Sequence, residues 1–164
     1  MRKNVKQQFA LRALSTAALM AMVSSIATAA FADTYDLNKG SVTVETKENG
    51  ITYVTQENTE INDHQDDTGV TITSGGEKTS NTITVETAKD QTTDVTLENV
   101  HIEVNTTRAK SGAIEIKGDG DTNLELNGDN TVLVENEWSE EHAAIEKADK
   151  YGTGTLTIKD DVND

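Results

Sequence analysis

Ile83-Thr-Val-Glu86 is followed 31 residues later by Ile114-Glu-Ile-Lys117, and a further 31 residues lead to Ile145. In the first two segments an apolar residue alternates with a polar one, which is the two-residue period of a strand with one buried face. A constant spacing between similar segments indicates a repeat architecture. These segments therefore decide between an ordinary sheet and a stack of equivalent coils.

Two further series of apolar pairs recur at a similar spacing. One contains Val95/Leu97, Leu124/Leu126 and Leu156/Ile158, and the other contains Val70/Ile72, Ile102/Val104 and Val132/Val134. The three series alternate in a constant order, so one repeat holds three short strands.

The repeat is weaker near the start of the chain. Ile51/Tyr53 precedes Ile83/Val85 by 32 residues and fits the first series, which places Tyr53 in the core. Val42/Val44 alternates as well, but the spacing assigns it to no series.

Three strands per repeat predict an all-β fold, a short right-handed parallel β-helix (β-solenoid) of about four coils of about 31 residues. Each apolar pair becomes buried only when the next coil places its equivalent pair about 4.8 Å away. An antiparallel β-sandwich also has alternating strands, but it requires no constant period. We therefore favour the solenoid.

The first 32 residues have the pattern of a secretory signal peptide, with an uncleaved anchor helix as the alternative. A basic start precedes the apolar stretch 13–30, and Ala30-Phe31-Ala32 has the small-x-small form of a cleavage site. We divide the chain into a signal peptide at 1–32, a capping region at 33–68 and solenoid repeats at 69–164. Because the last apolar pair lies near Asp164, we expect the repeats to continue in a longer protein.

Composition excludes several functional classes. The 164 residues include 29 Asp+Glu, 14 Lys+Arg and no Cys, for a net charge of −15. Four of the basic residues precede residue 33, so 29 acidic and 10 basic side chains would remain after cleavage, a net charge of −19. Such a charge disfavours nucleic acid and anionic membranes as partners. The absence of Cys excludes disulfides, thiolate zinc sites and cysteine nucleophiles.

Three stretches resemble secreted bacterial carbohydrate-binding-domain and adhesin-type β-helix proteins of the pectate-lyase-like kind. They are Val95-Thr-Leu-Glu-Asn-Val-His-Ile-Glu-Val104, Leu124-Glu-Leu-Asn-Gly-Asp-Asn-Thr-Val132, and Ala143-Ala-Ile-Glu-Lys147 together with Gly154-Thr-Leu-Thr-Ile158. The resemblance covers roughly 69–158. It implies a right-handed parallel β-helix, secreted or displayed on a bacterial cell surface, that binds an extracellular polysaccharide or a host glycan. A structural stalk segment of a larger adhesin or autotransporter passenger is the alternative.

Aromatic residues are the candidate contacts for a sugar ligand, because flat rings stack on sugar faces. Trp138 and Tyr151 lie on predicted turns of one coil, where both rings could contact a ligand, with Trp138 covering the flank of the solenoid as the alternative.

Calcium is the one cofactor that the sequence suggests. Asp119, Asp121 and Asp129 supply oxygen ligands on glycine-rich turns, and Asp63, Asp66 and Asp67 form another acidic cluster. The predicted register also places Glu115 beside Glu146, where a cation would relieve the repulsion. Solvated acidic turns are the alternative, and a melting temperature that rises with calcium would favour the metal.

We expect no enzymatic activity. A β-helix polysaccharide lyase needs a basic residue beside a calcium-bound uronate. Arg108 and Lys110 are the basic pair closest to that pattern, but Asp119 and Asp121 follow nine or more residues later.

Overall fold

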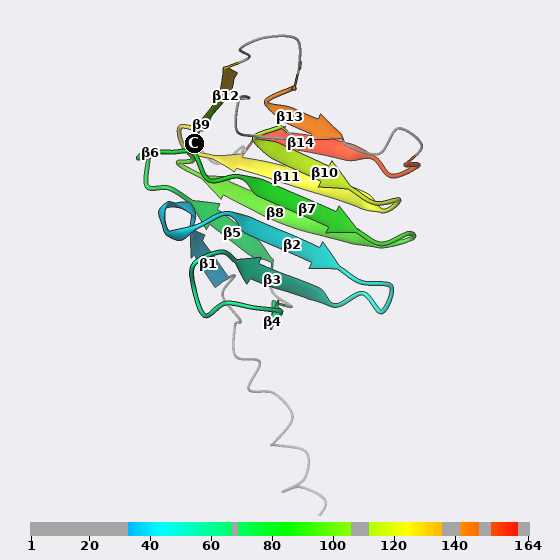
Figure 1. Cartoon of the computed structure of the whole chain (residues 1–164). Coiled ribbons are helices and arrows are strands. Elements are labelled where there is room, and N and C mark those ends of the chain that lie inside the picture. The colour runs from blue at the N-terminus through cyan, green and yellow to red at the C-terminus, as the bar shows by residue number, and fades with distance from the viewer. Residues whose placement is uncertain (1–32, 67–68, 106–111, 136–141, 148–151, 161–164) are drawn as a thin grey trace, which may run out of the picture. The chain divides into compact units, whose positions relative to one another are not determined.

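The computed structural model describes residues 33–66, 69–105, 112–135, 142–147 and 152–160, and these form short strands stacked one above another (Figure 1). Their elements are β1 (Asp33–Asp36), η1 (Leu37–Lys39, a 3-10 turn), β2 (Val42–Thr46), β3 (Thr52–Gln56), β4 (His64–Gln65), β5 (Val70–Thr73), β6 (Lys78–Thr79), β7 (Ile83–Thr87), β8 (Thr92–Glu98), β9 (His101–Asn105), β10 (Ile114–Lys117), β11 (Asp121–Asn127), β12 (Thr131–Glu135), β13 (Ile145–Lys147) and β14 (Leu156–Asp160).

These strands form three sheets, which the chain visits in turn. Sheet A has the order β1-β5-β8-β11-β14, sheet B the order β13-β10-β7-β2-β3-β4, and sheet C the order β12-β9-β6. From β5 onward the chain passes from sheet A to C to B and back to A, and every pairing between coils is parallel. The predicted all-β parallel solenoid is confirmed, while its right-handed sense stays a prediction.

The first predicted series forms one interior column. Ile114 is the register partner of both Ile83 and Ile145. Ile83 and Ile114 are completely buried. Val42 extends the column at the other end, because it pairs with Ile83. The alternation of apolar and polar residues thus separates the interior from the surface, as a half-buried strand requires.

The assignment of Ile51/Tyr53 to this column was wrong. β2, which holds Val42 and Val44, occupies that position, and β3 then turns back antiparallel to β2. Tyr53 lies opposite Glu45, only half-buried, with the Lys47 Nζ 4.4 Å from its ring centroid. The 32-residue spacing between Ile51/Tyr53 and Ile83/Val85 suggested the wrong column, because a hairpin here replaces the turn of an ordinary coil.

Val70/Ile72 was also assigned to the wrong series. Val70 pairs with Val95 in sheet A, only 25 residues away. The sheet C position of that coil belongs to β6, whose Lys78 and Thr79 pair with His101 and Ile102. A two-residue strand with no aliphatic pair carries no alternation, so the sequence pattern passed over it.

The last strand is displaced by two residues from its predicted register. Leu156 pairs with Thr122, and Ile158 pairs with Leu124. A shift of two keeps the same side chains facing inward. The Asp121 carboxylate accepts hydrogen bonds from the backbone N–H and the hydroxyl of Thr155, both at 2.8 Å, and these contacts hold the observed register.

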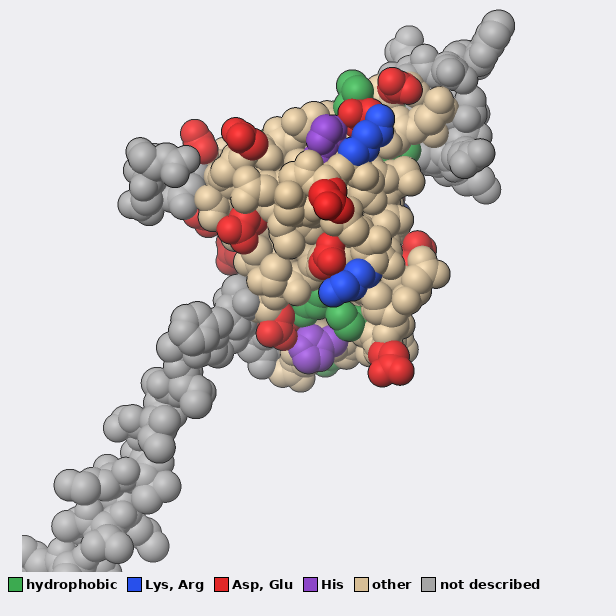
Figure 2. Space-filling view, turned by 90° about the vertical axis from the view of Figure 1, so that its left-hand side faces the viewer, with side chains coloured by type: hydrophobic (Ala, Val, Ile, Leu, Met, Phe, Trp, Pro, Cys, Tyr) green, Lys and Arg blue, Asp and Glu red, His purple; other side chains and the backbone are tan. Residues whose placement is uncertain are grey.

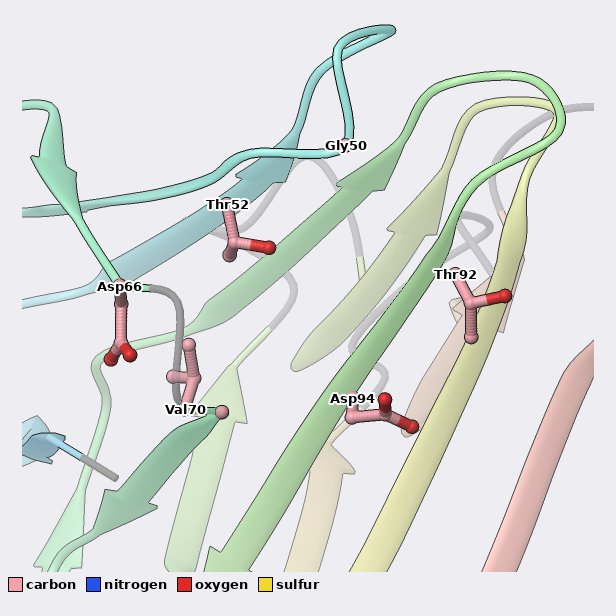
Figure 3. A pocket seen from close by; sticks show the side chains of 7 residues that line it. Gly50, Thr52, Asp66, Val70, Thr92 and Asp94 are labelled. Carbon is pink, nitrogen blue, oxygen red and sulfur yellow. The ribbon is translucent and has the colours of Figure 1, made fainter. Parts of the chain in front are cut away.

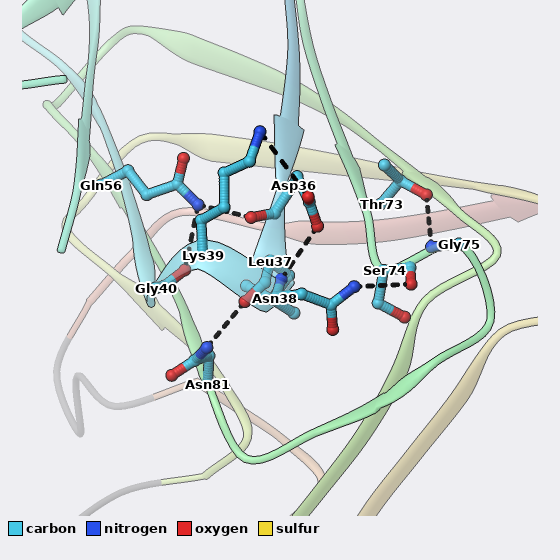
Figure 4. Close-up of polar contacts among 10 residues, drawn as sticks. All are labelled: Asp36, Leu37, Asn38, Lys39, Gly40, Gln56, Thr73, Ser74, Gly75 and Asn81. Carbon is cyan, nitrogen blue, oxygen red and sulfur yellow. Dashed lines mark hydrogen bonds and ion pairs between the residues drawn. The ribbon is translucent and has the colours of Figure 1, made fainter. Parts of the chain in front are cut away.

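The N-terminal end of the solenoid is closed. The β3–β4 hairpin continues sheet B beyond β2, and η1 takes the place of a sheet C strand in the first coil, with Leu37 completely buried. Polar side chains anchor this turn (Figure 4). Asn81 donates from Nδ2 to the Leu37 carbonyl, and Asn38 donates to the Ser74 carbonyl, at 2.7 and 2.9 Å.

The opposite end is more open. Ile158 is 49% exposed, whereas its register partner Leu124 is completely buried. In the described part of the chain, Leu133 and Ile158 are the large hydrophobic side chains with substantial exposure. The interior therefore loses its cover from the middle coils toward β14.

Threonine hydroxyls fill the corner between sheets B and A. Thr93 donates to Thr46 at 2.6 Å, and Thr87 lies 2.7 Å from Thr93 and 3.2 Å from Thr122. All four side chains are buried. A buried hydroxyl is tolerated because it is hydrogen-bonded, and each of these bonds joins one coil to the next or closes a corner.

Candidate functional site

The outward side of sheet A is a polar surface built from equivalent positions of successive strands. We call it the sheet A face. Its longest row contains Thr34, Thr71, Thr96, Glu125 and Lys159, which are register partners in sequence. Because neighbouring strands lie about 4.8 Å apart, the five strands span about 19 Å. Polar side chains at equivalent positions in register give this surface a regular spacing.

A second row of the sheet A face contains Asp94, Asn123 and Thr157. Asn123 donates from Nδ2 to an oxygen of the Asp94 carboxylate at 2.7 Å, which orients both side chains. The two rows offer hydroxyl, amide and carboxylate groups, and Lys159 is the only basic residue in them. Hydroxyl and amide groups both donate and accept hydrogen bonds, and carboxylates accept them, so the face can pair with ligands that carry hydroxyl groups.

A cavity of about 240 Å³ adjoins this face where β8 begins. It exists because the chain leaves the coil after β2 to form the β3–β4 hairpin and joins sheet A only at β5. Figure 3 shows the side chains around the hollow. Its lining consists of Gly50, Thr52, Asp66, Gly69, Val70, Thr92 and Asp94.

Asp66 is the buried carboxylate of this cavity, with only 4% of its surface exposed. The Tyr35 hydroxyl donates to its Oδ2 at 3.2 Å. Burial raises the pKa of Tyr35 strongly, and the neighbouring Asp66 charge raises it further. Tyr35 therefore stays a neutral donor and holds the carboxylate in place, as a buried charge requires.

Sheet B places Glu115 beside Glu146, as the sequence predicted, and Lys117 beside Glu86. Lys117 lies 2.8 Å from Glu115. Glu146 accepts hydrogen bonds from the Gly112 N–H at 3.1 Å and from the His142 Nδ1 at 3.0 Å. Protein groups thus relieve the repulsion for which the sequence suggested a cation.

Sheet C carries a compact charged group on its outer side. Glu103 forms an ion pair with Lys78 and accepts a hydrogen bond from the His101 Nε2 at 2.9 Å. The hydrogen bond from Lys78 and then that from His101 lower the pKa of Glu103. Figure 2, turned to the left-hand side of Figure 1, shows acidic side chains scattered among polar ones. Ion pairs at the surface, such as Lys78 with Glu103, contribute little to stability.

The predicted calcium ligands do not converge on one point. Asp119 and Asp121 precede or begin β11, and Asp129 follows its far end, about 20 Å away at strand rise. Asp119 and Asp121 accept hydrogen bonds from Thr153 and Thr155 of the last coil. Among the described residues, no group of three or more His, Cys, Asp and Glu side chains could hold a metal ion. A calcium effect stays a prediction for the turn that holds Asp119 and Asp121.

Asp67 of the acidic cluster lies outside the described residues, and so do four other residues singled out in the sequence. These four are the expected sugar contacts Trp138 and Tyr151 and the basic pair Arg108 and Lys110. Their roles stay predictions.

Sequence reasoning noticed Asp66 only as part of an acidic cluster, and it missed Asp94. Asp94 occupies an outward position of β8. In the sequence its position is that of an ordinary exposed residue in an alternating strand. Asp94 lines the same cavity as Asp66 because the β3–β4 hairpin interrupts the coil. A break in the repeat between Val44 and Val70 was the signal that could have marked the cavity.

No family model matches the chain, and no curated protein or solved structure is significantly similar to it. Within the described ranges, no helix is long and apolar enough to cross a membrane.

Proposed function

We propose that this protein is an exported binding module that attaches to an extracellular polysaccharide through the sheet A face. The expected resemblance to secreted β-helix proteins suggests the ligand class. The observation that carries the proposal is the row from Thr34 to Lys159, which repeats polar groups at the interstrand spacing.

An extended polymer suits such a surface because both partners are linear and repetitive. A single hydroxyl contact is worth little, since it replaces a contact with water. Several contacts in register add up along one chain, because after the first contact the remaining ones form within the same complex. A regular face therefore favours a long ligand over a free sugar.

Charge narrows the class of polymer. Carboxylates of Asp94 and Glu125 lie on the face, and the whole chain has a net charge of −15. Like charges repel across an interface, so polymers rich in uronic acid or sulfate are disfavoured. We expect a neutral or amino-bearing polysaccharide.

The test compares two threonine variants in an otherwise identical protein. Thr96 lies on the central strand β8 of the sheet A face, and Thr84 lies on β7 of sheet B; both are half-buried on a strand with neighbours on both sides. Thr96→Lys places a long cationic side chain across the row, and we expect a loss of polymer affinity of about tenfold. Thr84→Lys adds the same charge to another sheet and should bind normally.

Binding is measured by a glycan array, followed by affinity electrophoresis on the polysaccharides that respond. Equal losses in both variants would show that the sheet A face is not the contact surface. A wild-type protein that binds no glycan would favour the stalk alternative. Ultraviolet absorbance of unsaturated products on pectate checks for lyase activity, which we expect to be absent.

A further inference from the structure

The strongest unassigned feature is the cavity at the start of β8, beside the sheet A face. We infer that it is a subsite for one sugar unit of the bound polysaccharide, and that this unit is a neutral or amino sugar and not a uronic acid. This inference rests on the proposed function and adds to it the class of sugar.

Size is the first argument. The cavity holds about 240 Å³, which is less than the roughly 300–1,000 Å³ typical of sites for drug-sized ligands. A single pyranose ring fits such a space, whereas an oligosaccharide does not. One unit would enter the cavity while the rest of the polymer follows the sheet A face.

Continuity with the face is the second argument. Thr92 and Asp94 belong to both, because they line the cavity and occupy outward positions of β8. Asp121, the partner of Thr92, and Asn123, the partner of Asp94, continue the surface on β11. A polymer on the face thus meets the cavity without crossing another element.

The chemistry of the lining is the third argument. Asp66 and Asp94 present carboxylate oxygens, and Thr52 and Thr92 present hydroxyls. Among the described residues, no basic side chain lines the cavity. Carboxylates only accept hydrogen bonds, and the hydroxyl or ammonium groups of a sugar donate them. A uronate would bring its charge against two carboxylates with no cation between them, which disfavours it.

Preorganisation is the fourth argument. Asp66 is nearly fully buried, with its Oδ2 held by Tyr35, and Asp94 is oriented by Asn123. Side chains that are already fixed lose little conformational entropy when a ligand arrives. The cavity is therefore formed before the sugar binds.

The experiment uses the full chain and two matched variants. Thr92 is the first residue of β8 and Thr131 the first residue of β12, and both side chains are exposed. Thr92→Lys places a cation in the cavity, while Thr131→Lys adds the same charge on sheet C. Short oligomers of glucose, glucosamine and galacturonate, equal in length, are titrated while backbone amide resonances are followed by NMR.

We expect glucose or glucosamine oligomers to shift the amide resonances of Gly50, Gly69 and Asp94, and galacturonate to leave them unchanged. Thr92→Lys should weaken binding about tenfold or more, and Thr131→Lys should not. Asp66→Asn keeps the size of the side chain but removes its charge, and it should weaken glucosamine more than glucose. Thermal melts establish that each variant is folded.

The two proposals fail in different ways. If the wild type binds a polysaccharide but the three amides do not move and Thr92→Lys binds normally, the subsite is wrong and the binding face remains. A preference for galacturonate would overturn the sugar class. If no glycan binds, both proposals are overturned together.

Discussion

Single residues in this protein act mainly by joining one coil to the next. Asp121 is the clearest case, because its carboxylate holds the backbone N–H and the hydroxyl of Thr155 in the last coil. These two hydrogen bonds, the backbone one first, lower the pKa of Asp121. The same side chain had suggested a calcium ligand, which shows that an acidic turn residue can serve the protein's own backbone.

The pKa of Asp121 gives a prediction about pH. Its folded value lies below the unfolded value of about 3.9, so its contribution to stability is present above that pH and is lost as the pH falls through the folded pKa. The amide resonance of Thr155 should therefore titrate with a midpoint below about 3.9. Asp121→Asn should abolish this titration, and Asp90→Asn on a neighbouring turn should not. A midpoint at or above the unfolded value would contradict the assignment.

Gly120 shows the steric side of the same contact between coils. A Cβ at this position would overlap the Ala88 carbonyl oxygen and the Thr87 side chain of the preceding coil. Gly120→Ala should therefore destabilise the protein by about 1–3 kcal/mol, measured by urea unfolding. Ser80→Ala, at an exposed loop position, serves as the control. Equal unfolding midpoints for the two variants would show that the turns are free to move apart.

At the scale of elements, each strand depends on the strand above and the strand below. The column through Ile83, Ile114 and Ile145 illustrates this, since Ile114 is covered from both sides and completely buried, whereas Ile145 is only half-buried. The number of neighbouring coils, and not the residue type, sets how much apolar surface is removed from water.

Two identical substitutions in this column test the dependence on neighbours. Ile114→Ala should lower the free energy of unfolding by about 3–4 kcal/mol, within the range for a buried isoleucine. Ile145→Ala should cost about half as much, because part of its side chain is already in water. Urea unfolding gives both values. Equal losses would mean that the last coil is as well covered as the middle one.

At the scale of the whole molecule, the two ends differ. The N-terminal end is closed by the β3–β4 hairpin and by buried Leu37, and at the other end Ile158 is half exposed. In a stack with nearest-neighbour contacts, stability is shared unevenly and the less covered coil opens first.

Native-state hydrogen exchange should reveal this gradient. Amides of β7 and β8 should exchange only through global unfolding, while those of β13 and β14 should exchange through a smaller opening. Increasing urea should therefore raise exchange in the last coil with a smaller slope than in β7 and β8, because the smaller opening exposes less surface. Uniform protection in all coils would show that the stack opens as one cooperative unit.

The sequence by itself determined the solenoid and its first column, because the alternation of Ile83-Thr-Val-Glu86 and its return at Ile114 follow directly from burial between stacked strands. It did not determine β3, β6 or the register of β14. β3 pairs back on β2, β6 pairs with β9, and Asp121 holds β14, and each of these contacts forms only once the coils are in place. The cavity at Asp66 and Asp94 is likewise a product of tertiary structure, since it arises where the chain leaves the repeat. A repeat in the sequence reflects only the contacts that recur in every coil. The cavity forms where the repeat is interrupted, so only the tertiary structure determines it.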